Sequence, residues 1–111
     1  GKSLPVPHCI KGTVGHKLYG GLADALKGNL CFEKNTFPSL EMAKYLEGKD
    51  FDTIELCGLV SNICVLSNAV MAKSACPNSE IIVDSSLTAA ADEEIHQKSL
   101  DVMKGLFIKV L

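Results

Sequence analysis

The sequence predicts an α/β fold in which parallel strands alternate with helices. Short apolar runs of strand length recur along the chain, and segments with apolar residues at helical spacing lie between them. This alternation predicts a parallel sheet with right-handed crossover connections. The composition agrees with one small globular domain over residues 1–111, because 47% of the residues are hydrophobic and 22% are charged.

The first third of the chain holds few regular elements. Residues 1–21 are rich in proline and glycine, and we expect an irregular loop there, which is unusual at the start of a globular domain. Residues 22–26 suit one or two turns of helix. Residues 30–34 suit a short strand, which Asn35 and Pro38 end.

A helix is predicted over residues 40–47. Ser39 precedes it as a capping residue, and Gly48 follows it as a helix stop. Leu40, Ala43 and Leu46 share one face of this helix.

Residues 53–66 form the stretch around which the other elements are organised. The pattern predicts a buried strand from Thr53, a sharp turn, and then a helix that begins near Ile63. Asn62 is the expected N-cap of that helix. Cys64 therefore lies in the first helical turn, where backbone N–H groups and the helix dipole favour an anion such as a thiolate.

The remaining elements follow the same alternation. The helix after Ile63 ends near Cys76, because Pro77 disfavours helical geometry in the residue before it. A strand is predicted over residues 80–84 and another over residues 106–111.

Between those two strands, Asp92 opens a helix that ends near Gly105. Ile95, Ser99 and Met103 are expected on its core-facing side, together with Val102.

Ligands of parallel sheets bind beyond the carboxyl ends of the strands. The residues expected there are Lys34, the turn over residues 59–64, and Asp84 with its two following serines. Side chains that are distant in sequence can therefore converge on one crevice.

Charge and cysteine content exclude several classes of function. The net charge is −2, so neither nucleic acid nor an anionic membrane surface is an expected partner. The sequence has no arginine, so it offers no arginine clamp for a carboxylate or phosphate. The sequence contains no apolar run of about 18 residues, so no membrane span is predicted. The five cysteines form no Cys-x-x-Cys pair, which favours reduced thiols in a cytoplasmic protein.

Three residues are candidates for chemistry, and each has a plainer interpretation. Cys64 is either a nucleophile or one more small buried residue. Lys34 is either a surface lysine or a cation that stabilises a neighbouring thiolate. His8 has no partner at metal-ligand spacing, so these residues alone do not predict a closed metal site.

Three motifs, taken together and in order, resemble a known family. They read His-Cys-x-x-Gly-Thr at residues 8–13, Glu-Lys-x-Thr-Phe at residues 33–37, and Gly-Leu-Val-Ser-Asn-Ile-Cys-Val at residues 58–65. They resemble the isochorismatase-like cysteine hydrolases, and the first motif is closest to the nicotinamidase branch. The likeness extends over the whole chain and implies a Rossmann-like three-layer fold with helices on both faces of the sheet.

The resemblance assigns roles to individual residues. It implies that Cys64 is the nucleophile and Lys34 the lysine of a Cys-Asp-Lys triad. The peptide bond between Leu59 and Val60 matches the family's cis bond, and the backbone N–H groups of Val60 and Cys64 would form the oxyanion hole. His8 matches one ligand of a metal ion, usually zinc. The implied reaction is hydrolysis of a small amide, such as nicotinamide to nicotinate, through a thioester.

The chain departs from the family pattern before His8. The triad aspartate and two further metal ligands have no counterpart in the sequence. We therefore expect the C-terminal part of such an enzyme, without its N-terminal strands, with roughly 70 residues of an ordinary domain absent. Such a chain would have an exposed strand edge, which a homo-oligomer or pairing with an N-terminal fragment could cover. Zinc or another divalent metal would need ligands from that fragment.

Other functions compete with amide hydrolysis. A non-catalytic or truncated relative could keep the fold for assembly. The isochorismatase branch cleaves a vinyl ether instead, without a nucleophilic role for the cysteine. A redox-sensing thiol would need only an activated Cys64.

Overall fold

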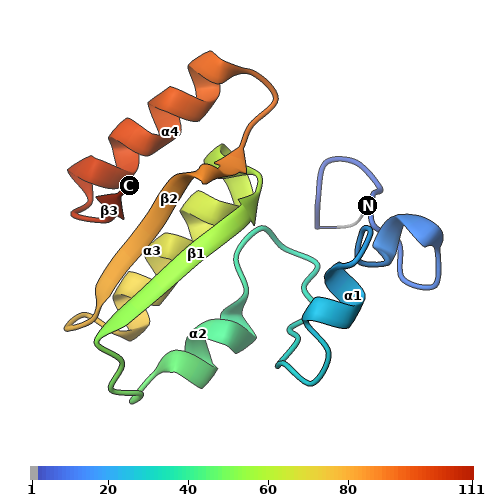
Figure 1. Ribbon diagram of the computed structural model, residues 1–111, viewed down its shortest axis with the longest axis horizontal. Helices are drawn as coiled ribbons and strands as arrows, with labels where there is room; N and C mark the ends of the chain where they lie inside the picture. The colour runs from blue at the N-terminus through green and yellow to red at the C-terminus, as the bar shows by residue number, and fades with distance from the viewer. Residues whose placement is uncertain (1–2) are drawn as a thin grey trace. The chain divides into compact units, whose positions relative to one another are not determined.

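The computed structural model describes residues 3–111, which divide into two compact units (Figure 1). The first unit ends at Thr36 and the second is Phe37–Leu111. One domain over residues 1–111 stays a prediction.

The first unit is mostly irregular in its described residues. It contains the short 3-10 turn η1 (Val14–His16) and the single-turn helix α1 (Leu22–Ala25), which confirms the predicted turn. The predicted strand over residues 30–34 is wrong, and Lys34 therefore does not follow a strand. A strand needs a partner for its backbone hydrogen bonds. The described part of this unit offers no second strand.

The second unit confirms the α/β class and the parallel sheet. Strands β1 and β2 pair in parallel, as do β2 and β3, in the order β1-β2-β3. Each connection carries a helix. The elements are α2 (Leu40–Leu46), β1 (Thr53–Leu59), the π-helical turn η2 (Ser61–Val65), α3 (Leu66–Ala75), β2 (Glu80–Ala89), α4 (Glu93–Gly105) and β3 (Lys109–Val110).

Two helices begin at the capping residues that the sequence predicts. The Ser39 hydroxyl accepts a hydrogen bond of 3.1 Å from the Met42 N–H at the start of α2. The Asp92 carboxylate accepts one of 2.8 Å from the Ile95 N–H at the start of α4. Each bond satisfies a backbone donor that the helix itself leaves unpaired.

One hydrophobic core lies between the sheet and its helices. Alternate residues of β2 contribute to it, since Ile81 and Val83 are almost fully buried while the neighbouring Ile82 is half-buried. Small residues let α3 approach closely, because Ala69 and Ala72 have no exposed surface. The other members of the core are Leu46, Val65, Cys76, Leu100, Met103 and Ile108.

The opposite face of β1 is open in the second unit. Ile54 and Leu56 pack against the core, whereas the alternate residues Glu55, Cys57 and Leu59 are exposed. No helix of residues 37–111 covers that face. These residues therefore supply the sheet and one helical layer of the predicted three-layer fold. β1 also lies at one edge of this three-stranded sheet.

The second strand runs past its predicted end at residue 84. Val83 pairs with Leu56 and Thr88 pairs with Gly58, so β2 carries several more residues than β1 between these two pairs. This irregularity places residues 84–87 outside the regular ladder. The final strand is shorter than predicted, because only Lys109–Val110 pairs with β2. Among the described residues, no helix is both long and apolar enough to cross a membrane.

Candidate functional site

The turn after β1 brings the candidate nucleophile into a helix start. The peptide bond between Leu59 and Val60 is cis, at the position where the resemblance places one. The Val60 carbonyl then accepts hydrogen bonds of 3.1 Å from both the Ile63 and the Val65 N–H groups. The second of these spans five residues, which defines a π turn. Cys64 lies in this turn, directly before α3 begins at Leu66.

The predicted cap at Asn62 is wrong. The helical turn begins at Ser61, so the capping position falls on Val60, and no side chain caps this end. Asn62 is already inside the turn. The sequence pattern put the start of the helix near Ile63, because it could not reveal a wider π turn before the α-helix.

Cys64 differs from the other four thiols in its surroundings. It is half-buried, whereas three cysteines are exposed and Cys76 is buried. The Cys76 thiol donates a hydrogen bond of 3.2 Å to the Leu46 carbonyl inside the core. Cys76 is therefore the small buried structural cysteine of this unit, and Cys64 is not.

Asn68 connects Cys64 to the beginning of the second unit. Its side-chain amide donates hydrogen bonds of 2.8 Å to the Cys64 carbonyl and 3.2 Å to the Phe37 carbonyl. Its oxygen accepts a third, of 2.8 Å, from the Ser39 N–H. Sequence reasoning missed this residue. The only signal was a polar side chain four residues after Cys64, on the same side of the helix.

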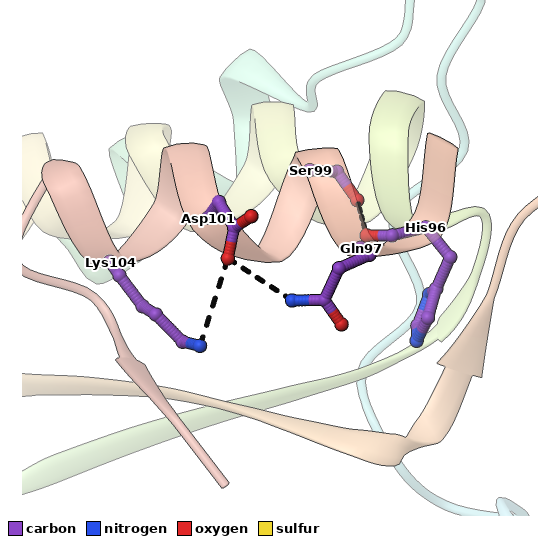
Figure 2. Close-up of polar contacts among 5 residues, drawn as sticks. All are labelled: His96, Gln97, Ser99, Asp101 and Lys104. Carbon is purple, nitrogen blue, oxygen red and sulfur yellow. Dashed lines mark hydrogen bonds and ion pairs between the residues drawn. The ribbon is translucent and has the colours of Figure 1, made fainter. Parts of the chain in front are cut away.

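A second polar network holds the other end of the turn. The Ser61 hydroxyl lies 2.6 Å from Nδ1 of His96 in α4 and 3.0 Å from the Thr88 hydroxyl in β2. The exposed fraction is 0% for Ser61 and 8% for both partners. In Figure 2 the His96 ring projects from α4, whereas Asp101 contacts Gln97 and Lys104 along the exposed helix surface.

The predicted face of α4 explains why His96 was missed. Ile95 and Val102 were expected in the core, but 36% and 52% of their surfaces are exposed. The buried residues of α4 are His96, Ser99, Leu100 and Met103, so the prediction is confirmed for Ser99 and Met103 and wrong for Ile95 and Val102. The available signal was the spacing of His96, which lies three residues before Ser99 and four before Leu100 and so shares their helix face.

A cavity of about 400 Å³ lies between β2 and the start of α4. Ser85, Ser86 and His96 line it, and Cys64 does not. The expectation that Asp84 and its neighbours share one crevice with the Cys64 turn is therefore not met by this cavity. The Asp84 carboxylate instead accepts hydrogen bonds of 2.6 Å from the Ser86 hydroxyl and 2.9 Å from its N–H. These bonds lower the pKa of Asp84.

Two predicted site residues lie in the first unit. Lys34 is exposed, and its ammonium group donates a hydrogen bond of 3.1 Å to the Thr36 carbonyl. The preceding Glu33 pairs with Lys11, and this contact lowers the pKa of the Glu33 carboxyl and raises that of Lys11. The pairing of Lys34 with Cys64 stays a prediction.

His8 does not form a metal site with the described residues. It is exposed, and its Nδ1–H donates a hydrogen bond of 2.9 Å to the Val6 carbonyl. Within residues 3–111, no group of three His, Cys, Asp or Glu side chains is placed to hold a metal ion. Since zinc needs three or four protein ligands, these residues do not fit a zinc site.

Comparison with known proteins places this chain in a family. The sequence profile of the isochorismatase domain matches residues 1–111. Among curated proteins, none matches the chain.

Solved structures with the same fold include two bacterial amidases. A nicotinamidase/pyrazinamidase from Bacillus subtilis is 27% identical with a TM-score of 0.78, and the match covers 95% of this chain and 62% of that one. A pyrazinamidase/nicotinamidase from Streptococcus mutans is 29% identical with a TM-score of 0.79, covering 96% of this chain and 63% of that one. The chain thus spans less than two thirds of the length of either.

A third solved structure shares the fold alone. It is a pyrazinamidase of Pyrococcus horikoshii in complex with zinc, 22% identical with a TM-score of 0.73. The match covers 95% of this chain and 61% of that one.

Proposed function

The chain belongs to the isochorismatase family, and we propose that it supplies the thiol nucleophile of a cysteine hydrolase that cleaves a small-molecule amide. The observation that carries this proposal is the position of Cys64. It is a half-buried thiol in a π turn between a parallel strand and α3. The nicotinamidase neighbours support an amide of the nicotinamide class as substrate.

The helix start favours an anionic sulfur. N–H groups of a first helical turn point toward its N-terminal end, and the helix dipole adds a partial positive charge there. The proposal requires a thiolate at this position, because the thiolate is the nucleophilic form of cysteine. Together η2 and α3 span residues 61–75, so the helical segment is long enough to have a substantial dipole.

The proposed reaction has two steps. Cys64 Sγ adds to the amide carbonyl carbon, the carbon–nitrogen bond breaks, and the nitrogen leaves as ammonia with the thiol proton. Water then hydrolyses the thioester, which releases the carboxylic acid and restores the thiol. The backbone N–H groups of Val60 and Cys64 are the proposed donors to the oxyanion.

Lys34 is the proposed partner of the thiolate. Its ammonium group would stabilise the charged sulfur and the anionic intermediate. The Glu-Lys-x-Thr-Phe motif supports this role, and Phe37, which ends that motif, is hydrogen-bonded to Asn68 next to Cys64.

A metal is not part of the proposed steps. The resemblance assigns one ligand to His8, and a fold neighbour is a zinc complex. One histidine without a second or third ligand among the described residues cannot define the position of a metal ion.

Ammonia release tests the proposal. The protein is incubated with nicotinamide, and ammonia is measured for the wild type, for Cys64→Ala and for Cys57→Ala. Cys57 is an exposed thiol on β1 and is the matched control. We expect Cys64→Ala to lose at least about 1,000-fold in rate, because no other group replaces the nucleophile, and Cys57→Ala to keep the wild-type rate. Equal rates for the wild type and Cys64→Ala, with an unchanged circular dichroism spectrum, would refute the mechanism.

A further inference from the structure

Three polar side chains from three elements meet in the interior of the second unit. Ser61 begins η2, Thr88 lies in β2 beyond the register irregularity, and His96 lies in the second turn of α4. The hydroxyl of Ser61 is central, at 2.6 Å from His96 Nδ1 and 3.0 Å from Thr88 Oγ1. The proposed function gives none of these side chains a role.

The network is satisfied only while all its members are present. A serine hydroxyl donates one hydrogen bond and accepts others, so Ser61 can accept from one partner and donate to the other. Removing the ring nitrogen of His96 would leave the wholly buried Ser61 hydroxyl without its shorter bond. Ser61 would keep its bond to Thr88, but a buried hydroxyl that loses one of two hydrogen bonds loses stabilisation, so the turn would be held less firmly.

Ser61 transmits this constraint directly to the Cys64 turn. Its carbonyl accepts the hydrogen bond from the Leu66 N–H that closes the π turn, and its side chain is held by α4 and β2. Cys64 lies between Ser61 and Leu66 in that turn. Any displacement of Ser61 therefore moves the backbone that orients the Cys64 thiol.

We propose that His96 is a positioning residue for Cys64, acting through the hydroxyl of Ser61. The effect on catalysis rests on the proposed function, whereas the effect on the geometry of the thiol does not. A misplacement of about 1 Å in a reacting group can cost on the order of 100-fold in rate. We therefore expect loss of the His96–Ser61 bond to lower kcat by about 10- to 100-fold while KM changes little.

Two substitutions at His96 separate the hydrogen bond from packing. His96→Leu removes the ring nitrogen, whereas His96→Asn keeps a polar atom bonded to Cγ, where Nδ1 is bonded in histidine. Ser99→Ala is the matched control on the same helix. The Ser99 hydroxyl is buried and donates a hydrogen bond of 2.7 Å to the His96 carbonyl, so its loss affects α4 without removing the bond to Ser61.

The experiment measures three quantities for these variants and for Ser61→Ala. They are Tm, the kcat and KM for nicotinamide, and the ratio of iodoacetamide alkylation rates at Cys64 and Cys57. We expect His96→Leu and Ser61→Ala to lower kcat and to change the alkylation ratio by several-fold. His96→Asn should restore both to within about threefold of the wild type, and Ser99→Ala should leave both unchanged whatever its Tm.

Two results would overturn the inference. One is a His96→Asn variant that folds but is as impaired as His96→Leu; the other is an unchanged alkylation ratio in His96→Leu. If the wild type hydrolyses no amide, the proposed function fails on its own. The alkylation ratios across the same variants then still decide the positioning role.

Discussion

Cys64 and Cys76 lie at opposite ends of one helical segment, yet their surroundings differ. Cys76 is 4% exposed and its thiol donates to the Leu46 carbonyl, so it is both packed and hydrogen-bonded. Cys64 is half-buried at the N-terminal end, where the helix dipole favours an anion. Residue type alone could not separate the two. Their positions relative to Ser61 and Pro77, which were visible in the sequence, could.

Asn68 gives a stability prediction at the residue scale. Its amide makes three hydrogen bonds, which join Cys64 to Phe37 and Ser39. Asn68→Leu keeps a similar volume but loses all three, so we expect the free energy of unfolding to fall by about 1–3 kcal/mol. Urea denaturation measures this.

Asn68→Asp is the informative companion variant. A carboxylate can still accept from the Ser39 N–H but cannot donate to the two carbonyls. It should therefore be less stable than the wild type. If both variants had the urea midpoint of the wild type, these hydrogen bonds would contribute nothing to stability.

The polar networks mark the limit of sequence reasoning for individual residues. The turn, its cysteine and the position of the cis bond followed from local pattern and resemblance. His96 and Asn68 did not, because their partners Ser61 and Phe37 are 35 and 31 residues away in the chain. A partner at that separation is determined by packing, which one sequence does not reveal.

Element boundaries were predictable where a local chemical signal defined them. Ser39 and Asp92 cap their helices as expected, because capping depends only on the next three residues. Residues 30–34 failed as a strand, because a strand depends on a partner elsewhere. On α4, Ser99 and Met103 are buried as expected, whereas His96 and Leu100 are buried in place of Ile95 and Val102.

The irregular part of β2 gives a pH prediction at the element scale. The Ser86 hydroxyl and N–H stabilise the Asp84 carboxylate and lower its pKa from the ordinary value of 3.8. A lowered pKa in the folded state adds stability above pH 3.8. That stability is lost as the pH falls through the lower folded value.

Urea midpoints as a function of pH check this sign. We expect Ser86→Ala to be less stable than the wild type near neutral pH, and the difference to shrink as the pH falls below 3.8. In an Asp84→Asn background, the effect of Ser86→Ala should not vary over this range. A difference that grows toward acid would contradict the assignment.

At the scale of the whole molecule, the alternation of strands and helices was sufficient to predict the parallel sheet. Its strand order β1-β2-β3 follows from right-handed crossovers in one direction. The composition suggested one domain, and the structure describes two compact units. The proposed pairing of Lys34 with Cys64 joins residues of two different units. Local periodicity predicts helices and strands within each unit and does not predict such a pairing.

Trapping the thioester tests the central claim most directly. The protein is incubated with nicotinamide, quenched in acid within the first turnovers, and examined by intact mass and peptide mapping. We predict a species heavier by one nicotinoyl group, located on the peptide that contains Cys64 and absent in Cys64→Ala. Release of nicotinate by a protein that shows no adduct at Cys64, and whose Cys64→Ala variant still turns over, would contradict nucleophilic catalysis by this cysteine.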